Sequence, residues 1–186
     1  MLADLLRHSR HTPTIWCAAA STGEEPYSIA MTAADALGPG IRPRILATDI
    51  DTGVLATARR GVYSLEAAAP VPPNQLRRYF LRGSGENAGR VRVRPELGAM
   101  IDFRQLNLLD PDWKLGGGFD AIFCRNVLIY FDKPTQRSLL ERMARVLRPG
   151  GLLFIGHSEN ITDRRDLFRL RGKTAYERLA EAKAAC

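Results

Sequence analysis

Short apolar runs alternate with segments of helical periodicity along most of this chain. The runs cover residues 15–19, 44–48, 101–106, 119–124 and 152–155. A helix is expected after the first run, with Pro26 in its first turn and its end at residues 38–40. Two further helices are expected at residues 52–60 and 134–147. Alternation of this kind is typical of an α/β fold with a mostly parallel sheet.

The alternation breaks between residues 61 and 100. This segment holds a proline-rich stretch at 69–73, a short helix expected at 74–81 and a Gly-rich turn at 83–89. Residues 90–94 alternate Arg and Val, a period of two that indicates a strand with one wet face. We therefore expect an inserted, small antiparallel β-subdomain at residues 61–100. A second antiparallel element, a closing hairpin, is expected from residues 168–171 and 175–179.

Composition narrows the class of protein. The 186 residues, 45% of them hydrophobic and 25% charged, suit one globular domain. The longest apolar runs are far shorter than the roughly 20 residues of a membrane span, and the polar start of the chain does not resemble a signal peptide. Three cysteines are too few for a disulfide framework or a zinc ribbon. We expect a cytoplasmic protein with no metal site and no membrane insertion.

Polar residues follow the predicted strands, at the edge where open α/β sheets bind ligands. The first strand leads into Glu24 and Glu25 at a helix start, which argues against a phosphate ligand. Asp49 follows the second strand, where a ribose diol lies in such folds, whereas Asp51 fits the N-cap of the next helix better. Asn107 follows the third strand and offers an amide to a base edge. The pattern predicts a nucleotide-like ligand that is cationic or neutral.

Five strings carry a resemblance to a known family. They are AAASTGEEPY at 18–27, ATDID at 47–51, NLL at 107–109, FDAIFCRNVLIYFD at 119–132 and LRPGGLLFIGHSE at 147–159. Over residues 12–181 the chain resembles the S-adenosylmethionine (SAM) domain of the bacterial chemotaxis receptor methyltransferases, the CheR family. The resemblance implies a Rossmann-like class I SAM-dependent methyltransferase fold, with SAM as cofactor and S-adenosylhomocysteine (SAH) as product.

The resemblance also implies roles for individual residues. Positions that contact SAM in the family correspond to Ala19, Glu25, Asp49, Asn107, Leu108, Arg125 and Asn126. Asp49 would hold the ribose hydroxyls, and Asn107 with Leu108 the adenine. The sequence leaves open whether Glu24 or Glu25 faces the ligand; Glu25 is our choice. Arg125 and Tyr130 match positions near the transferable methyl group and are the expected catalytic residues.

The family methylates glutamate side chains on the helical cytoplasmic part of chemoreceptors. In some members the small β-subdomain binds a peptide at the receptor C-terminus, and the loop at residues 82–90 resembles that type. The family's helical N-terminal domain is not visible in this chain, where only residues 2–10 precede the first strand. We expect a monomer whose net charge of +7 serves an acidic protein partner rather than nucleic acid.

The expected chemistry is transfer of a methyl group from a sulfonium to a carboxylate. A glutamate with a pKa of about 4.3 is ionised at pH 7, so no general base is needed, and Arg125 is expected to orient the carboxylate. A nucleic-acid amine methyltransferase would carry an Asn/Asp-Pro-Pro-aromatic string where this chain has RNVL. A nicotinamide dehydrogenase would need Gly-x-Gly-x-x-Gly. A non-catalytic receptor-binding or SAM-sensing module remains the alternative.

Overall fold

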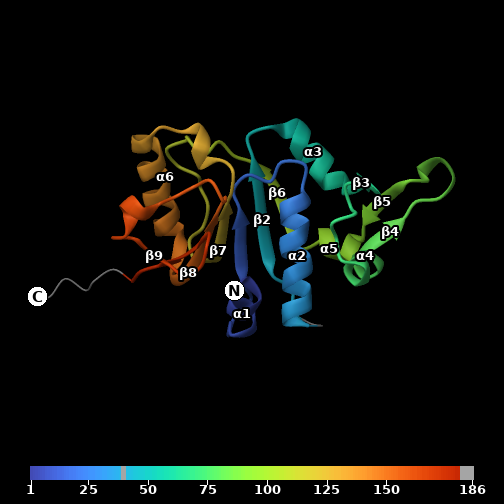
Figure 1. The fold of residues 1–186 in the computed structure, drawn as a ribbon, viewed down its shortest axis with the longest axis horizontal. Coiled ribbons are helices and arrows are strands. Elements are labelled where there is room, and N and C mark those ends of the chain that lie inside the picture. Colours follow the sequence, from blue (N-terminus) through green and yellow to red (C-terminus); the bar gives the residue numbers. More distant parts are fainter. Residues whose placement is uncertain (39–40, 181–186) are drawn as a thin grey trace, which may run out of the picture.

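The apolar runs form one large twisted sheet. The computed structural model describes residues 1–38 and 41–180, and within them seven strands pair in the order β6-β2-β1-β7-β8-β10-β9 (Figure 1). Their bounds are β1 Thr14–Cys17, β2 Arg44–Asp49, β6 Ile101–Gln105, β7 Phe119–Cys124, β8 Leu147–Ile155, β9 Phe168–Leu170 and β10 Ala175–Arg178. Strands β6, β2, β1, β7 and β8 are parallel, whereas β10 is antiparallel to β8 and β9. The predicted α/β fold with a closing hairpin is confirmed.

Helices cover both faces of this sheet. Helices α1 (Leu2–Arg7), α2 (Glu24–Leu37) and α3 (Thr52–Arg60) contribute Leu6, Ile29 and Leu55 to a core cluster that includes Ile15 of β1. Helix α6 (Lys133–Val146) shares a second cluster with Trp16, the next residue of β1. Because successive side chains of a strand point to opposite faces, the two clusters lie on opposite sides of the sheet.

The predicted insertion forms its own small sheet. Strands β3 (Val62–Ser64), β5 (Arg90–Val93) and β4 (Phe80–Arg82) pair in antiparallel fashion in the order β3-β5-β4. Val91 and Val93 are buried while Arg90 and Arg92 are exposed, as the period of two predicted. Short elements connect the strands: α4 (Pro73–Tyr79), η1 (Gly85–Asn87) and α5 (Pro95–Gly98). This sheet projects from the side of the molecule opposite α6 (Figure 1).

Some predicted boundaries shift for local reasons. Strand β1 ends at Cys17 rather than residue 19, because the chain turns through Ser21 with φ of 46°. Strand β8 begins at Leu147 rather than residue 152, and α4 ends at Tyr79 rather than residue 81. The predicted helix stop at Pro39 and Gly40, the domain limit at residue 181 and Cys186 lie outside the described residues.

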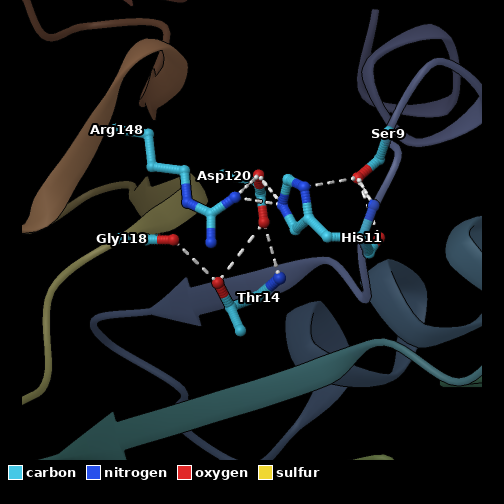
Figure 2. Close-up of polar contacts among 6 residues, drawn as sticks. All are labelled: Ser9, His11, Thr14, Gly118, Asp120 and Arg148. Carbon is cyan, nitrogen blue, oxygen red and sulfur yellow. Dashed lines mark hydrogen bonds and ion pairs between the residues drawn. The ribbon is translucent and has the colours of Figure 1, made fainter.

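A buried acid at the amino end of β7 ties the N-terminal segment to the sheet (Figure 2). The Asp120 carboxylate accepts hydrogen bonds from the backbone N–H of Thr14 at 2.7 Å and lies 2.8 Å from His11 Nε2. Arg148 from β8 contacts both Asp120 and His11. These contacts fix where β1 enters the sheet. Among residues 1–38 and 41–180, no helix has the length and hydropathy that a membrane crossing requires.

Candidate active site

The candidate site lies at the carboxyl edge of the parallel strands, the upper edge in Figure 1. The strand order reverses between β1 and β7, because the chain proceeds from β1 to β2 and β6 before it returns to β7. Ligands of open α/β sheets bind at such a switch point. Of the eight large apolar side chains exposed in the described residues, four follow strand ends at this edge: Ile50, Leu109, Ile129 and Tyr130. An exposed apolar rim around a polar edge is typical of a ligand site.

The loop after β1 brings its backbone close to the edge. Ala18 and Ala20 are held by N–H bonds to the carbonyls of Phe123 and Thr48, both at 2.8 Å, and Ala19 lies half-buried between them. Gly23 then starts α2 with φ of 101°. A Cβ at Gly23 would lie 2.8 Å from the Tyr63 hydroxyl, so this position requires glycine.

Asp49 ends β2 with its carboxylate fixed by two backbone amides. Its oxygens accept hydrogen bonds from the backbone N–H of Ser21 at 2.8 Å and of Asp51 at 3.1 Å. Carboxylate oxygens have further lone pairs, so Asp49 can still accept two hydroxyls of a ribose. The cap of α3 comes instead from Asp51, which accepts from the N–H of Gly53 and Val54, as predicted.

An ion pair joins the first turn of α2 to the segment that follows β7. Arg125 Nη1, after β7, lies 2.7 Å from Glu25 Oε1 at the start of α2. The Cys17 thiol donates to the other Glu25 oxygen at 3.3 Å, and burial, together with this carboxylate, raises the pKa of Cys17 well above its usual value. Glu24 is exposed and bonds to the Thr22 hydroxyl instead. The geometry therefore places Glu25, rather than Glu24, opposite Arg125.

A cavity of about 480 Å³ opens beside this ion pair. Its lining includes Leu2, Glu24, Glu25, Ser28, Ile29, Thr32, Phe123, Arg125 and Phe154. The rings of Phe123 and Phe154 stack at 4.4 Å and supply an apolar wall. Larger cavities, of about 630 and 840 Å³, involve Arg42, Arg44 and Met100 in one case and His8, His11 and Asp120 in the other. Neither contains a predicted site residue.

The loop after β6 places Asn107 and Leu108 differently. The Asn107 side-chain oxygen accepts the N–H of Leu109 at 2.9 Å, so its amide nitrogen is the group left for a ligand. Leu108 is 7% exposed and packs in the core with Trp113, whereas Leu109 is exposed. Arg142 of α6 holds this loop: its guanidinium donates to the Leu108 carbonyl at 3.0 Å and lies 3.9 Å from the Trp113 ring centroid.

The segment after β7 turns sharply at Asn126, whose φ is 59°. The short helix η2 (Leu128–Tyr130) follows, and Tyr130 is 79% exposed at its end. Three consecutive amides of this turn bond to the buried carboxylate of Glu159, which lies beyond the end of β8. His157 and Ser158, in the same string, are exposed.

The structure thus gathers Ala19, Glu25, Asp49, Asn107, Arg125, Asn126 and Tyr130 at one edge, while the Leu108 side chain lies in the core. Glu159 and Arg142 are not among the residues predicted from the sequence. An acid inside the GHSE string was the available signal for Glu159; nothing in the amphipathic pattern of α6 distinguished Arg142. No cluster of three or more metal-ligating side chains is found among the described residues.

Comparisons with known proteins show which family this chain resembles. The profile described as "CheR methyltransferase, SAM binding domain" matches residues 2–177. Chemotaxis protein methyltransferase 2 of Pseudomonas aeruginosa is 58% identical over 180 residues, covering 95% of this chain and 64% of that protein. The chemotaxis protein methyltransferase of Escherichia coli K12 is 54% identical over 178 residues, with coverage of 95% and 62%. The chain thus spans less than two thirds of the length of these relatives.

Solved structures support the fold alone. TrmN from Thermus thermophilus has a TM-score of 0.54 at 19% identity, covering 96% of this chain and 48% of that one. A TehB-like SAM-dependent methyltransferase from Corynebacterium glutamicum has a TM-score of 0.52 at 12% identity, covering 95% and 84%. The fold is that of the class I SAM methyltransferases, and the chain belongs to the family of CheR methyltransferase SAM-binding domains.

Proposed function

We propose that this chain methylates glutamate side chains on the cytoplasmic helices of chemoreceptors, with SAM as methyl donor, in the cytoplasm. The names of its relatives support the reaction class, and one observation in the structure carries the assignment. The Glu25–Arg125 ion pair, 2.7 Å apart at the switch point, lies at the same edge as the amide-anchored Asp49. A bare phosphate would be repelled by both carboxylates.

The side chains present fit SAM chemically. The amino-acid end of SAM carries an ammonium and a carboxylate, which match Glu25 and Arg125 respectively. Its ribose diol matches the free lone pairs of Asp49, and its adenine matches the Asn107 amide and the exposed Ile50 and Leu109. When bound, SAM supplies the methyl group as an activated sulfonium.

The chain's own residues then position and desolvate the substrate. The only hydrogen bond found for the Arg125 side chain among the described residues uses Nη1, so its other N–H groups can orient an incoming carboxylate. A glutamate is already ionised at pH 7, so no residue needs to remove a proton. Exposed Ile129 and Tyr130 are placed to exclude water from the carboxylate as the receptor docks. Alignment and desolvation would supply the rate enhancement.

We also propose that the small sheet binds the receptor, including a C-terminal peptide. Within the described residues, each outer strand of this sheet, β3 and β4, pairs on one edge only, and an extended peptide can add to the other. A cavity of about 240 Å³ on the small sheet has a lining that includes arginines 82, 90 and 92 together with Leu81. Acidic groups of a peptide would complement these cations.

The test combines calorimetry with SAH and transfer of a labelled methyl group to a receptor cytoplasmic fragment. We expect SAH binding and alkali-labile methyl esters on glutamate. Arg125→Ala should reduce methyl transfer by about 100-fold or more while SAH binding stays measurable, because Asp49 and Glu25 remain. Arg169→Ala, which removes an exposed arginine that pairs with Glu177 on β10, is the matched control.

Unchanged turnover in Arg125→Ala would contradict the role given to this arginine. SAH binding without any methyl transfer would instead favour the SAM-sensing module. Absence of SAH binding would favour a receptor-binding module and overturn the proposed activity.

A further inference from the structure

Glu159 is a buried acid whose hydrogen-bond partners, among the residues that the structure describes, are backbone amides. The residue is 9% exposed. Its carboxylate accepts hydrogen bonds from the backbone N–H groups of Asn126 at 3.1 Å, Val127 at 2.9 Å and Leu128 at 2.8 Å. The N–H of Gly156 donates to the same carboxylate. No ion pair involves Glu159 within the part of the chain that the structure describes. Burying an ionised carboxylate is unfavourable unless charged or dipolar partners compensate, and here four amides do so.

The end of β8 is shaped to let this carboxylate approach. A Cβ on Gly156 would lie 2.8 Å from Glu159 Oε2 and 3.0 Å from the Asn126 backbone nitrogen. Any side chain at position 156 would therefore push apart the acid and the turn that it binds. The first and last residues of the GHSE string thus share one task, which is to hold the neighbouring turn.

That turn carries the residues proposed to do the chemistry. Arg125 precedes the three bound amides directly, Asn126 supplies the first of them, and Tyr130 ends the helix that follows. Successive N–H groups that converge on one point form an anion-binding nest. Here the protein fills the nest with its own carboxylate, 33 residues away from Asn126 in sequence.

We propose that Glu159 is a positioning residue that holds the Arg125–Leu128 turn in the conformation needed for methyl transfer. This inference rests on the proposed function and extends it to a buried residue outside the set proposed to contact SAM or the substrate glutamate. Glu159 acts through Arg125: without the carboxylate, three amides lose their acceptor and the arginine loses its fixed starting point opposite Glu25.

The experiment uses Glu159→Gln in the full chain. The amide keeps the side chain's size but has one acceptor oxygen in place of two, and its NH2 faces N–H donors. We expect the amide proton signals of Val127 and Leu128 to move upfield and to exchange faster, and methyl transfer to fall by about 10- to 100-fold. Glu177→Gln is the matched control, because that acid pairs with side chains of Arg169 and Arg171 rather than with amides.

A double-mutant cycle separates positioning from general destabilisation. If Glu159 works through Arg125, the double variant with Arg125→Ala transfers methyl groups no more slowly than Arg125→Ala alone. Two independent losses would multiply, and that result would overturn the proposal. Wild-type amide signals and turnover in Glu159→Gln would overturn it as well.

Two provisions keep the test decisive. If Glu159→Gln does not fold, Gly156→Ala retains the acid but displaces it, and the same shifts and losses are expected. Unchanged Val127 and Leu128 signals in that variant would refute the role of Glu159.

If the wild-type chain shows no methyl transfer, the proposed function fails. The amide signals and SAH affinity of the variants then still test Glu159 separately, and an SAH affinity unaltered by the loss of the carboxylate would count against the inference.

Discussion

Asn126 has a backbone conformation that few residues tolerate. Its φ of 59° lies in the left-handed region, where a Cβ costs about 1–2 kcal/mol and asparagine is tolerated better than most residues. The residue thus has two separable duties: its backbone makes the turn toward Glu159, and its side chain is available at the proposed SAM site.

Asn126→Gly and Asn126→Ala distinguish these duties. Both remove the side-chain amide, so both should weaken SAH binding to a similar extent. Only alanine pays the steric cost of positive φ, so the alanine variant should be less stable than the glycine variant by about 1 kcal/mol. Urea unfolding curves check the difference, and an alanine variant as stable as the glycine variant would show that the turn relaxes.

For single residues, the sequence predicted which of them lie at the candidate site better than it predicted how their side chains are oriented. The cap by Asp51 follows from local chemistry, because Asp prefers the N-cap and the next helix begins one residue later. The choice between Glu24 and Glu25 depends on helix phase relative to β7, which no local rule supplies. The GHSE string marked Glu159 as an acid near the site, but its partners could not be predicted, because they are amides of a turn that is distant in sequence.

Asp35 connects two helices that belong to different parts of the fold. It lies on α2 and accepts hydrogen bonds from three residues of α4: Gln75 at 2.8 Å, Arg78 at 2.9 Å and the Tyr79 hydroxyl at 2.6 Å. Burial and this acid raise the pKa of Tyr79 to about 12. The small sheet is thereby held against the main domain by a polar clamp as well as by apolar packing.

Asp35→Ala should loosen α4 and β4 while leaving the large sheet intact. Each lost bond is worth about 1 kcal/mol, so the local free energy of opening should fall by about 1–3 kcal/mol. Hydrogen exchange of α4 amides should accelerate, with β1 and β7 unchanged; Asp102→Ala, which removes an exposed acid paired with Arg104, is the control. Equal exchange in both variants would show that apolar packing alone holds α4.

Because the pKa of Tyr79 is raised in the folded state, its stabilising contribution is complete below pH 10 and is lost as the pH rises toward 12.

Element types followed from sequence patterns, but some boundaries did not. The alternation of Arg and Val predicted β5, and the amphipathic face of α6 predicted that helix to within one residue at each end. Helix α1 was missed because its six residues make fewer than two turns, too short a stretch to show helical periodicity. It is stabilised by packing: Leu6 is fully buried beside α2, a tertiary effect that local propensity does not record.

The basic residues behind the net charge of +7 are unevenly distributed along the chain. The densest arginine group in sequence lies mostly in the small sheet and its neighbours, at positions 77, 78, 82, 90, 92, 94 and 104. Arg78 pairs with Asp35 and Arg104 with Asp102, and for the other five no ion pair is found within the described residues. A basic surface with few internal partners suits an acidic protein ligand and would speed its association.

Binding to an acidic receptor fragment should therefore weaken as salt rises. We expect the dissociation constant to increase by about tenfold between 50 and 300 mM salt, because screening shortens the reach of exposed charges. Arg82→Glu with Arg90→Glu should weaken binding at low salt and flatten this dependence. Arg169→Glu, on β9 at the far edge of the large sheet, should change neither. A salt-independent constant would point to an apolar interface instead.

The reactivity of the two buried thiols reports how each face of the large sheet opens. Cys17 belongs to the cluster packed by α2 and Cys124 to the cluster packed by α6, and both are fully buried with raised pKa values. A thiol reagent attacks the thiolate, so each cysteine reacts only when its own side of the sheet separates. With Cys186 replaced by serine, equal labelling rates at the two positions mean that the faces open together. Unequal rates identify the face that yields first, and added SAH should slow whichever opening disrupts its site.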